Sequence, residues 1–352
     1  MDHQKTLEEL IQTVIRQGGS DLHIGVGRVP AIRLNGELIF LMKHPKLTKE
    51  DMTGMLSLLL DKKRLDKFMS SQEVDFSYDF QGQARLRGNA FFQQGVISIA
   101  LRLVPKVRPL EELNLPAIIA DLARKKQGFF LCVGPVGQGK STTLAAMINL
   151  INNEQARHIV TIEDPVEHVY TPNKSMIDQR EVGIDTEDFH IALKSAFRED
   201  MNVIMIGEMR NPETIAAAVT AAETGHLVLS TLHTNNASQT VDRIIDSFPG
   251  NQQDQIRIQL ASSLLGIFSQ RLVPRIAGGL IPAYELLLNT SAVSNLIREK
   301  RTHEIDVIIE TGTESGMIDL NRSLLELVRT GEITMESAYQ FSLNPKALER
   351  LL

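Results

Sequence analysis

Short apolar runs that end in polar or charged residues recur through the middle of the chain. They fall at residues 128–133, 159–162, 203–206 and 227–232. Runs of this length, rich in β-branched residues, are typical of strands that are buried on both faces. Helical stretches lie between them, such as Ile215 to Glu223. Strands that alternate with helices predict an α/β fold with a mostly parallel sheet covered on both faces.

The N-terminal part has a different pattern. Apolar positions between Leu7 and Ile15 lie on one face of a helix that we expect to end at Gly18-Gly19. The segments 31–34 and 37–40 flank Asn35-Gly36, a pair that favours the type I′ turn of a β-hairpin. Further strands are expected at 74–80, 84–92 and 96–104. This pattern predicts a separate α+β domain.

Prolines mark the boundary between the two patterns. Pro105, Pro109 and Pro116 punctuate a stretch that is typical of a linker. We therefore expect an N-terminal domain over 1–106, a linker over 107–117 and a second domain over 118–352.

The C-terminal part is less informative. Ile256, Leu260, Leu264 and Ile267 are spaced as one helical stripe. From about residue 289 we expect a helical region, in which Ser291 is a suitable N-cap for the next helix.

A glycine-rich loop follows the first of the middle strands and precedes an apolar helix. It matches the phosphate-binding pattern G-x-x-x-x-G-K-[ST], whose backbone N–H groups surround nucleotide phosphates. Its candidate nucleotide-binding residues are Gly134, Pro135, Val136, Gly137, Gln138, Gly139, Lys140, Ser141 and Thr142. The pattern predicts a nucleoside triphosphate as ligand, with Lys140 on the β- and γ-phosphates and the Ser141 hydroxyl on Mg²⁺.

Polar side chains follow the other middle strands. Glu163, Glu208 and His233 each come after an apolar run. Ligands of such sheets bind at the carboxyl ends of the strands, so we expect these side chains to meet Lys140 at one site.

Several uncommon stretches occur together and in order. They are Gly19-Ser20-Asp21-Leu22-His23, the acidic box Glu163-Asp164-Pro165-Val166-Glu167-His168, Gly207-Glu208-Met209-Arg210, the two-histidine stretch 224–234 and the segment 292–299. In these the chain resembles the PilT-type ATPases, the type IV pilus retraction motors of the secretion-ATPase superfamily. The resemblance covers most of the chain.

The resemblance implies a homohexameric ring of subunits with an N-terminal PAS-like domain and a C-terminal RecA-like ATPase domain. It also implies a place at the cytoplasmic face of the inner membrane, reached through partners only. The implied partners are an inner-membrane pilus platform protein and a paralogous retraction ATPase.

Roles in phosphoryl transfer can be assigned to these residues from their chemistry and from the resemblance. Glu208 stands where the family has its catalytic carboxylate, so it is the candidate general base. Position 207 is glycine, where other NTPases often have an aspartate. We therefore expect Glu163 to help hold Mg²⁺, partly through water, or the attacking water. By resemblance, His233 would sense the γ-phosphate and His226 would support the subunit interface.

A ring motor also uses cations from a neighbouring subunit. Arg87 and Arg102 lie in the stretches Arg87-Gly88-Asn89 and Leu101-Arg102-Leu103, which align with the family. The resemblance therefore favours this role over the alternative that both arginines are ordinary solvent-facing strand residues. Gly88 replaces the family's usual valine, so the local strand geometry is expected to differ.

The segment 292–299 corresponds to the family's Ala-Ile-Arg-Asn-Leu-Ile-Arg-Glu, which these motors need for retraction. Here Val293 replaces isoleucine and Ser294 replaces arginine. From its spacing alone, the segment is an ordinary amphipathic surface helix.

Composition narrows the alternatives. A net charge of −6, no tryptophan and 5 % aromatic residues argue against a nucleic-acid translocase. The N-terminus lacks the pattern of a signal peptide, and no apolar window long enough to span a membrane is present. Both features favour a cytoplasmic protein. The only cysteine, Cys132, is expected in the core.

Two other functions stay open. One is a pilus-assembly or type II secretion ATPase, although the four-cysteine zinc motif common in those relatives is absent from this sequence. The other is a non-motor regulatory subunit of a pilus machine, which intact Lys140, Glu163 and Glu208 argue against.

Overall fold

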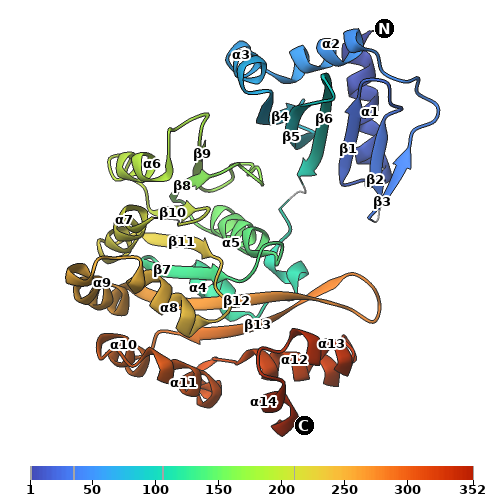
Figure 1. Cartoon of the computed structure of the whole chain (residues 1–352). Coiled ribbons are helices and arrows are strands. Elements are labelled where there is room, and N and C mark those ends of the chain that lie inside the picture. Colours follow the sequence, from blue (N-terminus) through green and yellow to red (C-terminus); the bar gives the residue numbers. More distant parts are fainter. Residues whose placement is uncertain (1, 35, 105–106, 210, 352) are drawn as a thin grey trace. The chain divides into compact units, whose positions relative to one another are not determined.

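The computed structural model describes residues 2–34, 36–104, 107–209 and 211–351. The chain forms two compact units (Figure 1). Unit 1 comprises Met1–Lys106 with Glu167–Val169, and unit 2 comprises Val107–Val166 with Tyr170–Leu352. Among the described residues, no helix is long and apolar enough to cross a membrane.

Unit 1 is a six-stranded antiparallel sheet with three helices. The strand order is β3-β2-β1-β6-β5-β4. The strands are β1 (Asp21–Gly25), β2 (Ala31–Leu34), β3 (Glu37–Phe40), β4 (Glu73–Phe80), β5 (Ala84–Gln93) and β6 (Val96–Val104). The helices are α1 (His3–Gln17), α2 (Lys49–Leu59) and α3 (Lys62–Ser71). Leu7, Leu10, Ile11 and Val14 of α1 are buried in its core.

The predicted first helix and the hairpin are confirmed. Asp2 caps α1 by accepting from the N–H of Lys5, and Gly18 ends it with a φ of 66°. The hairpin pairs β2 with β3 from Ala31↔Phe40 to Leu34↔Glu37. Asn35, on which the turn prediction rested, and Pro105, the first of the prolines that mark the expected boundary, lie outside the described residues.

The sheet of unit 1 gives a steric reason for the glycine at position 88. Gly88 lies opposite Phe76, and a Cβ at Gly88 would stand 2.2 Å from the Phe76 Cζ atom. The aromatic ring therefore fills the space that a valine at position 88 would occupy. The pairing of β4 with β5 runs without a shift from Glu73↔Phe91 to Phe80↔Ala84. The expected difference in local strand geometry from relatives that have valine at this position stays a prediction.

Unit 2 contains the predicted parallel sheet, so the α/β fold class is confirmed. The strand order is β13-β12-β7-β11-β10-β8-β9, and only the β12–β13 pair is antiparallel. The strands are β7 (Gly128–Val133), β8 (His158–Glu163), β9 (Met176–Glu181), β10 (Val203–Ile206), β11 (Leu227–Leu232), β12 (Leu264–Pro274) and β13 (Leu280–Leu288).

Helices cover both faces of this sheet (Figure 1). Phe129 and Leu131 of β7 pack on one face, whereas Phe130 and Cys132 pack on the other. This burial on both sides explains the continuous apolar runs. The first face meets α6 (Phe189–Ala196), α7 (Pro212–Glu223), α8 (Ala237–Asp246), α9 (Gly250–Ser263), α10 (Ser291–Arg298) and α11 (Ile305–Thr311). The second meets α4 (Ile118–Ala123) and α5 (Lys140–Glu154).

The C-terminal helices form a smaller core of their own with the β12–β13 hairpin. They are α12 (Leu320–Arg329), α13 (Met335–Phe341) and α14 (Pro345–Arg350). Leu324, Ala338 and Leu348 pack there with Val273 of β12 and Ile281 of β13.

The predicted helical stripe through Ile256, Leu260, Leu264 and Ile267 is wrong in its second half. Helix α9 ends at Ser263, and Leu264 already belongs to β12. From Leu264 onward the backbone pairs with Phe129 and its neighbours on β7. Pairing with a central strand satisfies the backbone, and it overrides an apolar spacing that suits either structure. The next predicted helix is present, but Thr290 caps it in place of Ser291.

Glu285 of β13 is a buried carboxyl group close to the C-terminal helices. Burial raises its pKa to about 7, although its bond with the N–H of Ala237, 2.7 Å long, acts in the opposite direction. The folded protein therefore binds this proton more tightly than the unfolded chain. Its contribution to stability is complete below pH 4.5 and is lost as the pH rises through about 7.

We expect Glu285→Gln to stabilise the protein progressively more as the pH rises from 5 to 8, by up to about 3 kcal/mol. Glutamine keeps an acceptor for the Ala237 N–H and carries no charge. The check is the difference in Tm between variant and wild type across this pH range. Glu326→Gln, at an exposed carboxylate of α12, is the control. A pH-independent difference for Glu285→Gln would contradict this assignment.

Candidate functional site

The glycines of the phosphate loop are required by its backbone. Gly134, Gly137 and Gly139 have φ values of 144°, 78° and 81°, which other residues rarely adopt. A Cβ at Gly134 would stand 2.5 Å from the Gln270 carbonyl oxygen, and one at Gly139 would stand 2.8 Å from Gln270 Nε2. The loop is therefore pressed against β12, while Pro135, Val136 and Gly137 stay exposed. Its backbone is free to receive an anion at the start of α5.

Lys140 is the buried cation of this loop. Its Nζ donates to the carbonyl oxygens of Gly134 and Pro135, at 2.7 and 2.8 Å. It also lies 3.3 Å from Nδ1 of His233. An ammonium group has no lone pair to accept with. This contact therefore requires His233 to accept at Nδ1 and, when neutral, to carry its proton on Nε2.

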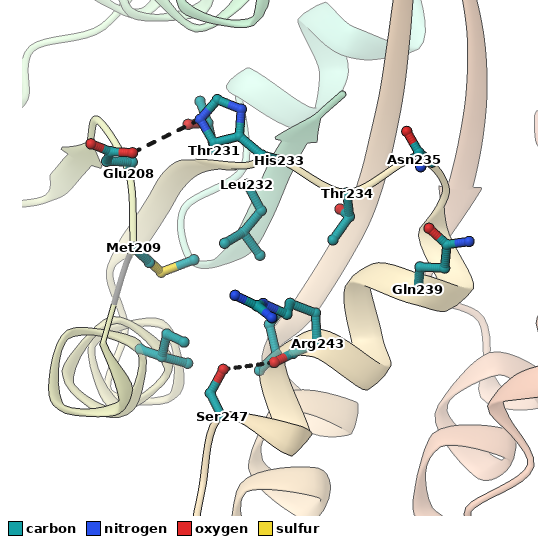
Figure 2. A pocket seen from close by; sticks show the side chains of 12 residues that line it. Glu208, Met209, Thr231, Leu232, His233, Thr234, Asn235, Gln239, Arg243 and Ser247 are labelled. Atoms are coloured by element: carbon teal, nitrogen blue, oxygen red, sulfur yellow. Dashed lines mark hydrogen bonds and ion pairs between the residues drawn. The ribbon is translucent and has the colours of Figure 1, made fainter. Parts of the chain in front are cut away.

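His233 connects this cation with Glu208. Its Nε2 lies 3.8 Å from Glu208 Oε2 (Figure 2). The side chains of Lys140, His233 and Glu208 thus form a continuous row from the phosphate loop to the end of β10. The predicted convergence of these residues is observed. Arg210, which follows in the Gly-Glu-Met-Arg stretch, lies outside the described residues.

Glu163 ends β8, the strand next to β10. The two strands pair in parallel up to Ile162↔Ile206. The Glu163 carboxylate is buried and accepts from Thr161 Oγ1 at 2.6 Å and from Gln179 Nε2 at 3.2 Å. A Cβ at Gly207 would stand 3.5 Å from the Glu163 backbone, so this glycine lets the two strand ends approach closely. Glu163 is therefore beside the row of the other site residues.

His226 lies elsewhere. It precedes Leu227 at the start of β11, whereas His233 follows its end. Its Nδ1 contacts the Ala221 carbonyl oxygen at 3.0 Å, and its ring packs edge-on against Phe197. Because the two histidines are at opposite ends of one strand, His226 does not share the site with His233.

Arg87 and Arg102 belong to unit 1. They are directly opposite each other on β5 and β6. Arg102 is 69 % exposed and donates from Nε to Asp21 Oδ1 at 2.8 Å. Burial by itself would raise the pKa of Asp21, but hydrogen bonds from Ser20 and Arg102 outweigh it and hold that pKa below its ordinary value. Arg87 donates from Nη1 to Glu167 Oε1 at 2.7 Å, so each of the two arginines forms an ion pair with a carboxylate of unit 1.

Sequence reasoning missed the contribution of β12. Gln270 accepts from Thr143 at 2.7 Å, and the N–H of Leu272 donates to Gln138 at 2.7 Å. Arg271 is buried and donates to both the backbone and the side-chain oxygen of Asn235, at 3.0 and 3.1 Å. This strand therefore holds the phosphate loop and the loop after His233 together. The polar run Ser269-Gln270-Arg271 within an apolar segment was the available signal.

A cavity of about 520 Å³ adjoins Glu208 and His233 (Figure 2). Residues of β11, the loop after it and α8 supply most of its walls. Its lining residues are Glu208, Met209, Ile215, Thr231, Leu232, His233, Thr234, Asn235, Gln239, Arg243, Ile244 and Ser247.

Comparison with known proteins agrees with this geometry. Residues 110–279 match the family model described as "Type II/IV secretion system protein". The chain is 42 % identical to the type IV pilus retraction ATPase PilT of Pseudomonas aeruginosa, over 94 % of this chain and 96 % of that protein. It is 40 % identical to the type IV pilus ATPase PilU of the same organism, over 94 % and 87 %.

A solved structure, the pilus retraction motor PilT with bound ADP, superimposes with a TM-score of 0.92 at 44 % identity. The match covers 97 % of this chain and 98 % of that one. Both the sequence and the fold thus agree along nearly the whole length. The chain therefore belongs to the PilT-type ATPases of the type II/IV secretion system protein family.

Proposed function

We propose that this protein is an ATP-hydrolysing motor that drives type IV pilus retraction, and hence pilus disassembly and twitching motility. The row from Lys140 through His233 to Glu208 is the observation that carries the ATPase part of the proposal. The near full-length likeness to a retraction ATPase supports the pilus part.

ATP binding would replace the internal bonds of the phosphate loop. Lys140 now donates to carbonyl oxygens of its own loop. Phosphate oxygens are stronger, charged acceptors, so the ammonium group would turn to the β- and γ-phosphates. The backbone N–H groups at the start of α5 would complete the cradle.

Magnesium fits the oxygen donors at this site. The exposed Ser141 hydroxyl lies in the first turn of α5, and Glu163 supplies a carboxylate at the end of β8. The described residues contain no cluster of metal-binding side chains. This suits Mg²⁺, which is usually held by one or two protein oxygens, nucleotide phosphates and water. When bound, the ion would neutralise charge on the phosphates.

Glu208 would act as general base on the attacking water. A proton would pass from that water to the carboxylate as the bond to the γ-phosphate forms. His233, in contact distance of both Lys140 and Glu208, is positioned to report the γ-phosphate to the base. Glu163 would orient the water or the metal.

A homohexameric ring would complete each site with Arg87 and Arg102 from a neighbouring subunit. Positive charge that arrives in trans stabilises the transition state and couples hydrolysis to motion. His226, remote from the chemistry, would serve the subunit interface.

Helix α10 would pass motion on without contacting phosphate. Its Ser294 hydroxyl donates to the Ala261 carbonyl oxygen at 2.9 Å and to Asn289 Oδ1 at 3.0 Å. The serine that replaces the family's arginine thus ties α10 to the end of α9. Arg298 remains exposed and donates only locally, to Asn295 at 2.8 Å.

The proposed partners follow from this role. They are an inner-membrane pilus platform protein and a paralogous retraction ATPase, at the cytoplasmic face of the membrane. The 40 % identity to the type IV pilus ATPase PilU beside 42 % to PilT keeps another type IV pilus ATPase as the second candidate function.

Two substitutions separate binding from hydrolysis. Lys140→Ala should weaken ATP binding by about 10- to 100-fold, because it removes a charged donor to the phosphates. Glu208→Gln should keep the affinity and lower kcat by about 10²- to 10⁴-fold, because it removes only the base. Nucleotide titration and steady-state turnover check both. Wild-type turnover by Glu208→Gln would refute the catalytic role of this residue.

The arginines can be tested by mixing subunits. Arg102→Ala removes an ion-pair partner of the buried Asp21 carboxylate and should lower stability by about 1–3 kcal/mol, so its folding is checked first by Tm. Its rings should turn over more slowly at unchanged nucleotide affinity. Rings mixed from Arg102→Ala and Glu208→Gln subunits should regain part of the activity, because some interfaces are then intact. If confirmed mixed rings stay inactive, Arg102 does not act in trans.

Motor output can be separated from chemistry at α10. Arg298→Ala should leave ATPase activity largely intact but abolish retraction, seen as hyperpiliated cells without twitching motility, and Arg298→Lys should restore part of it. Leu296→Ala is less suited, because Leu296 is buried and its truncation costs about 2–5 kcal/mol. Normal retraction in the Arg298→Ala strain would mean that α10 is only scaffold.

A further inference from the structure

The cavity beside Glu208 and His233 has no role in the reaction scheme above. Its lining contains no residue of the phosphate loop 134–142, all of which are among the described residues. The cavity thus lies next to the nucleotide cradle, on the side of the catalytic carboxylate. It is large enough, at about 520 Å³, for a small anion with its water.

One stripe of α8 supplies a polar wall. Gln239, Arg243 and Ser247 are spaced by four residues along and just past this helix, so they share one face. The Arg243 side chain projects from this wall in the close view (Figure 2). The opposite face of α8 is fixed in the core by Val241 and Ile245. Arg243 therefore stands on a rigid support.

Arg243 has a guanidinium group that no carboxylate of the described residues pairs with. The contact recorded for this residue uses its backbone oxygen, which accepts from Ser247 Oγ at 2.7 Å. Thr234, Asn235 and Gln239 add neutral donors from the same cavity. A planar guanidinium with hydroxyl and amide donors around it suits a tetrahedral oxyanion.

We propose that this cavity receives the inorganic phosphate produced by ATP hydrolysis, with Arg243 as its anion-binding residue. The proposal rests on the ATPase function given above. Glu208 lies at the point where the cavity and the proposed catalytic row meet. Phosphate formed beside Glu208 can therefore leave on this side while ADP still occupies the phosphate loop.

The change of charge on the Glu208 carboxyl group during hydrolysis is consistent with such an exit. The attacking water forms a new P–O bond, the bond from the γ-phosphorus to the ADP oxygen breaks, and one water proton goes to Glu208. The carboxyl group is then neutral beside the new phosphate. When it releases the proton to solvent, its negative charge repels the phosphate towards Arg243. The other nearby acids of α8, Asp242 and Asp246, are exposed, and Asp242 already accepts from Thr302 at 2.6 Å.

The test measures two quantities in the full-length protein: how strongly added phosphate inhibits the ATPase activity, and how tightly a nucleotide analogue binds. In Arg243→Gln, the phosphate concentration that half-inhibits steady-state ATPase activity should rise by about tenfold or more, because a charged hydrogen bond to phosphate is lost. The affinity for the non-hydrolysable analogue AMPPNP should stay within about twofold. Arg243→Lys should fall between the two, because it keeps charge without the planar donors.

Lys126→Gln is the matched control. It also removes one positive charge, but from an exposed position just before β7, and it should change neither value. An unchanged phosphate inhibition constant in Arg243→Gln would overturn the proposal. A parallel loss of AMPPNP affinity would overturn it as well, since Arg243 would then read the γ-phosphate of bound ATP.

A calorimetric titration of phosphate into ADP-saturated protein separates this proposal from the proposed function. If the wild type does not hydrolyse ATP, the proposed function fails, and the titration still decides the cavity. Phosphate binding that depends on Arg243 and not on Lys140 supports the site. Absence of binding overturns it, as does an Arg243→Gln variant that changes only the oligomeric state, which would assign this arginine to a subunit contact.

Discussion

The close approach of β12 to the phosphate loop is the constraint on which the rest of unit 2 depends. Gly134 can have no side chain because the Gln270 carbonyl oxygen occupies that space. The same strand bonds to Thr143 and Gln138 on one side and to Asn235 on the other. The phosphate loop and the loop that carries His233 are thus both held by hydrogen bonds to β12.

Strand β12 also contacts the C-terminal helices. Its far end, at Val273, packs in the core of the C-terminal helices. Arg271, in its middle, is buried, and burial lowers the pKa of its guanidinium group against the opposing charge of Glu285. One strand thus contacts both the phosphate loop and the core that α12 helps to form.

Most of unit 2 could be predicted from the sequence because its central strands are buried on both faces and leave continuous apolar runs. The row of Lys140, His233 and Glu208 followed from the rule that parallel strands end at one edge. The role of β12 could not be predicted, because Ile256 to Ile267 carries a spacing that suits a helix, and only pairing with β7 decides the structure. Likewise, His226 and His233 look alike in the sequence, and strand direction alone separates them.

Helices α2 and α3 of unit 1 were also missed. Thr48 caps α2 and Asp61 caps α3. Helix α2 carries a buried apolar stripe of Met52, Met55, Leu56 and Leu59, whereas the lysine-rich α3 buries Phe68. Conversely, Gly88 appears in the sequence only as a replacement for the family's valine, because Phe76, which fills the space beside it, lies on the neighbouring strand. Such compensation involves residues far apart in sequence, which no local pattern reports.

The buried cysteine has a practical consequence. Cys132 is enclosed between the sheet and α5, and burial raises the pKa of its thiol to about 12. At neutral pH almost no thiolate is present, so reagents that attack thiolates should leave the native chain unmodified. Single cysteines introduced at exposed positions can then carry fluorophores without removal of the natural one. Labelling of Cys132 itself would report opening of the strand that leads into the phosphate loop.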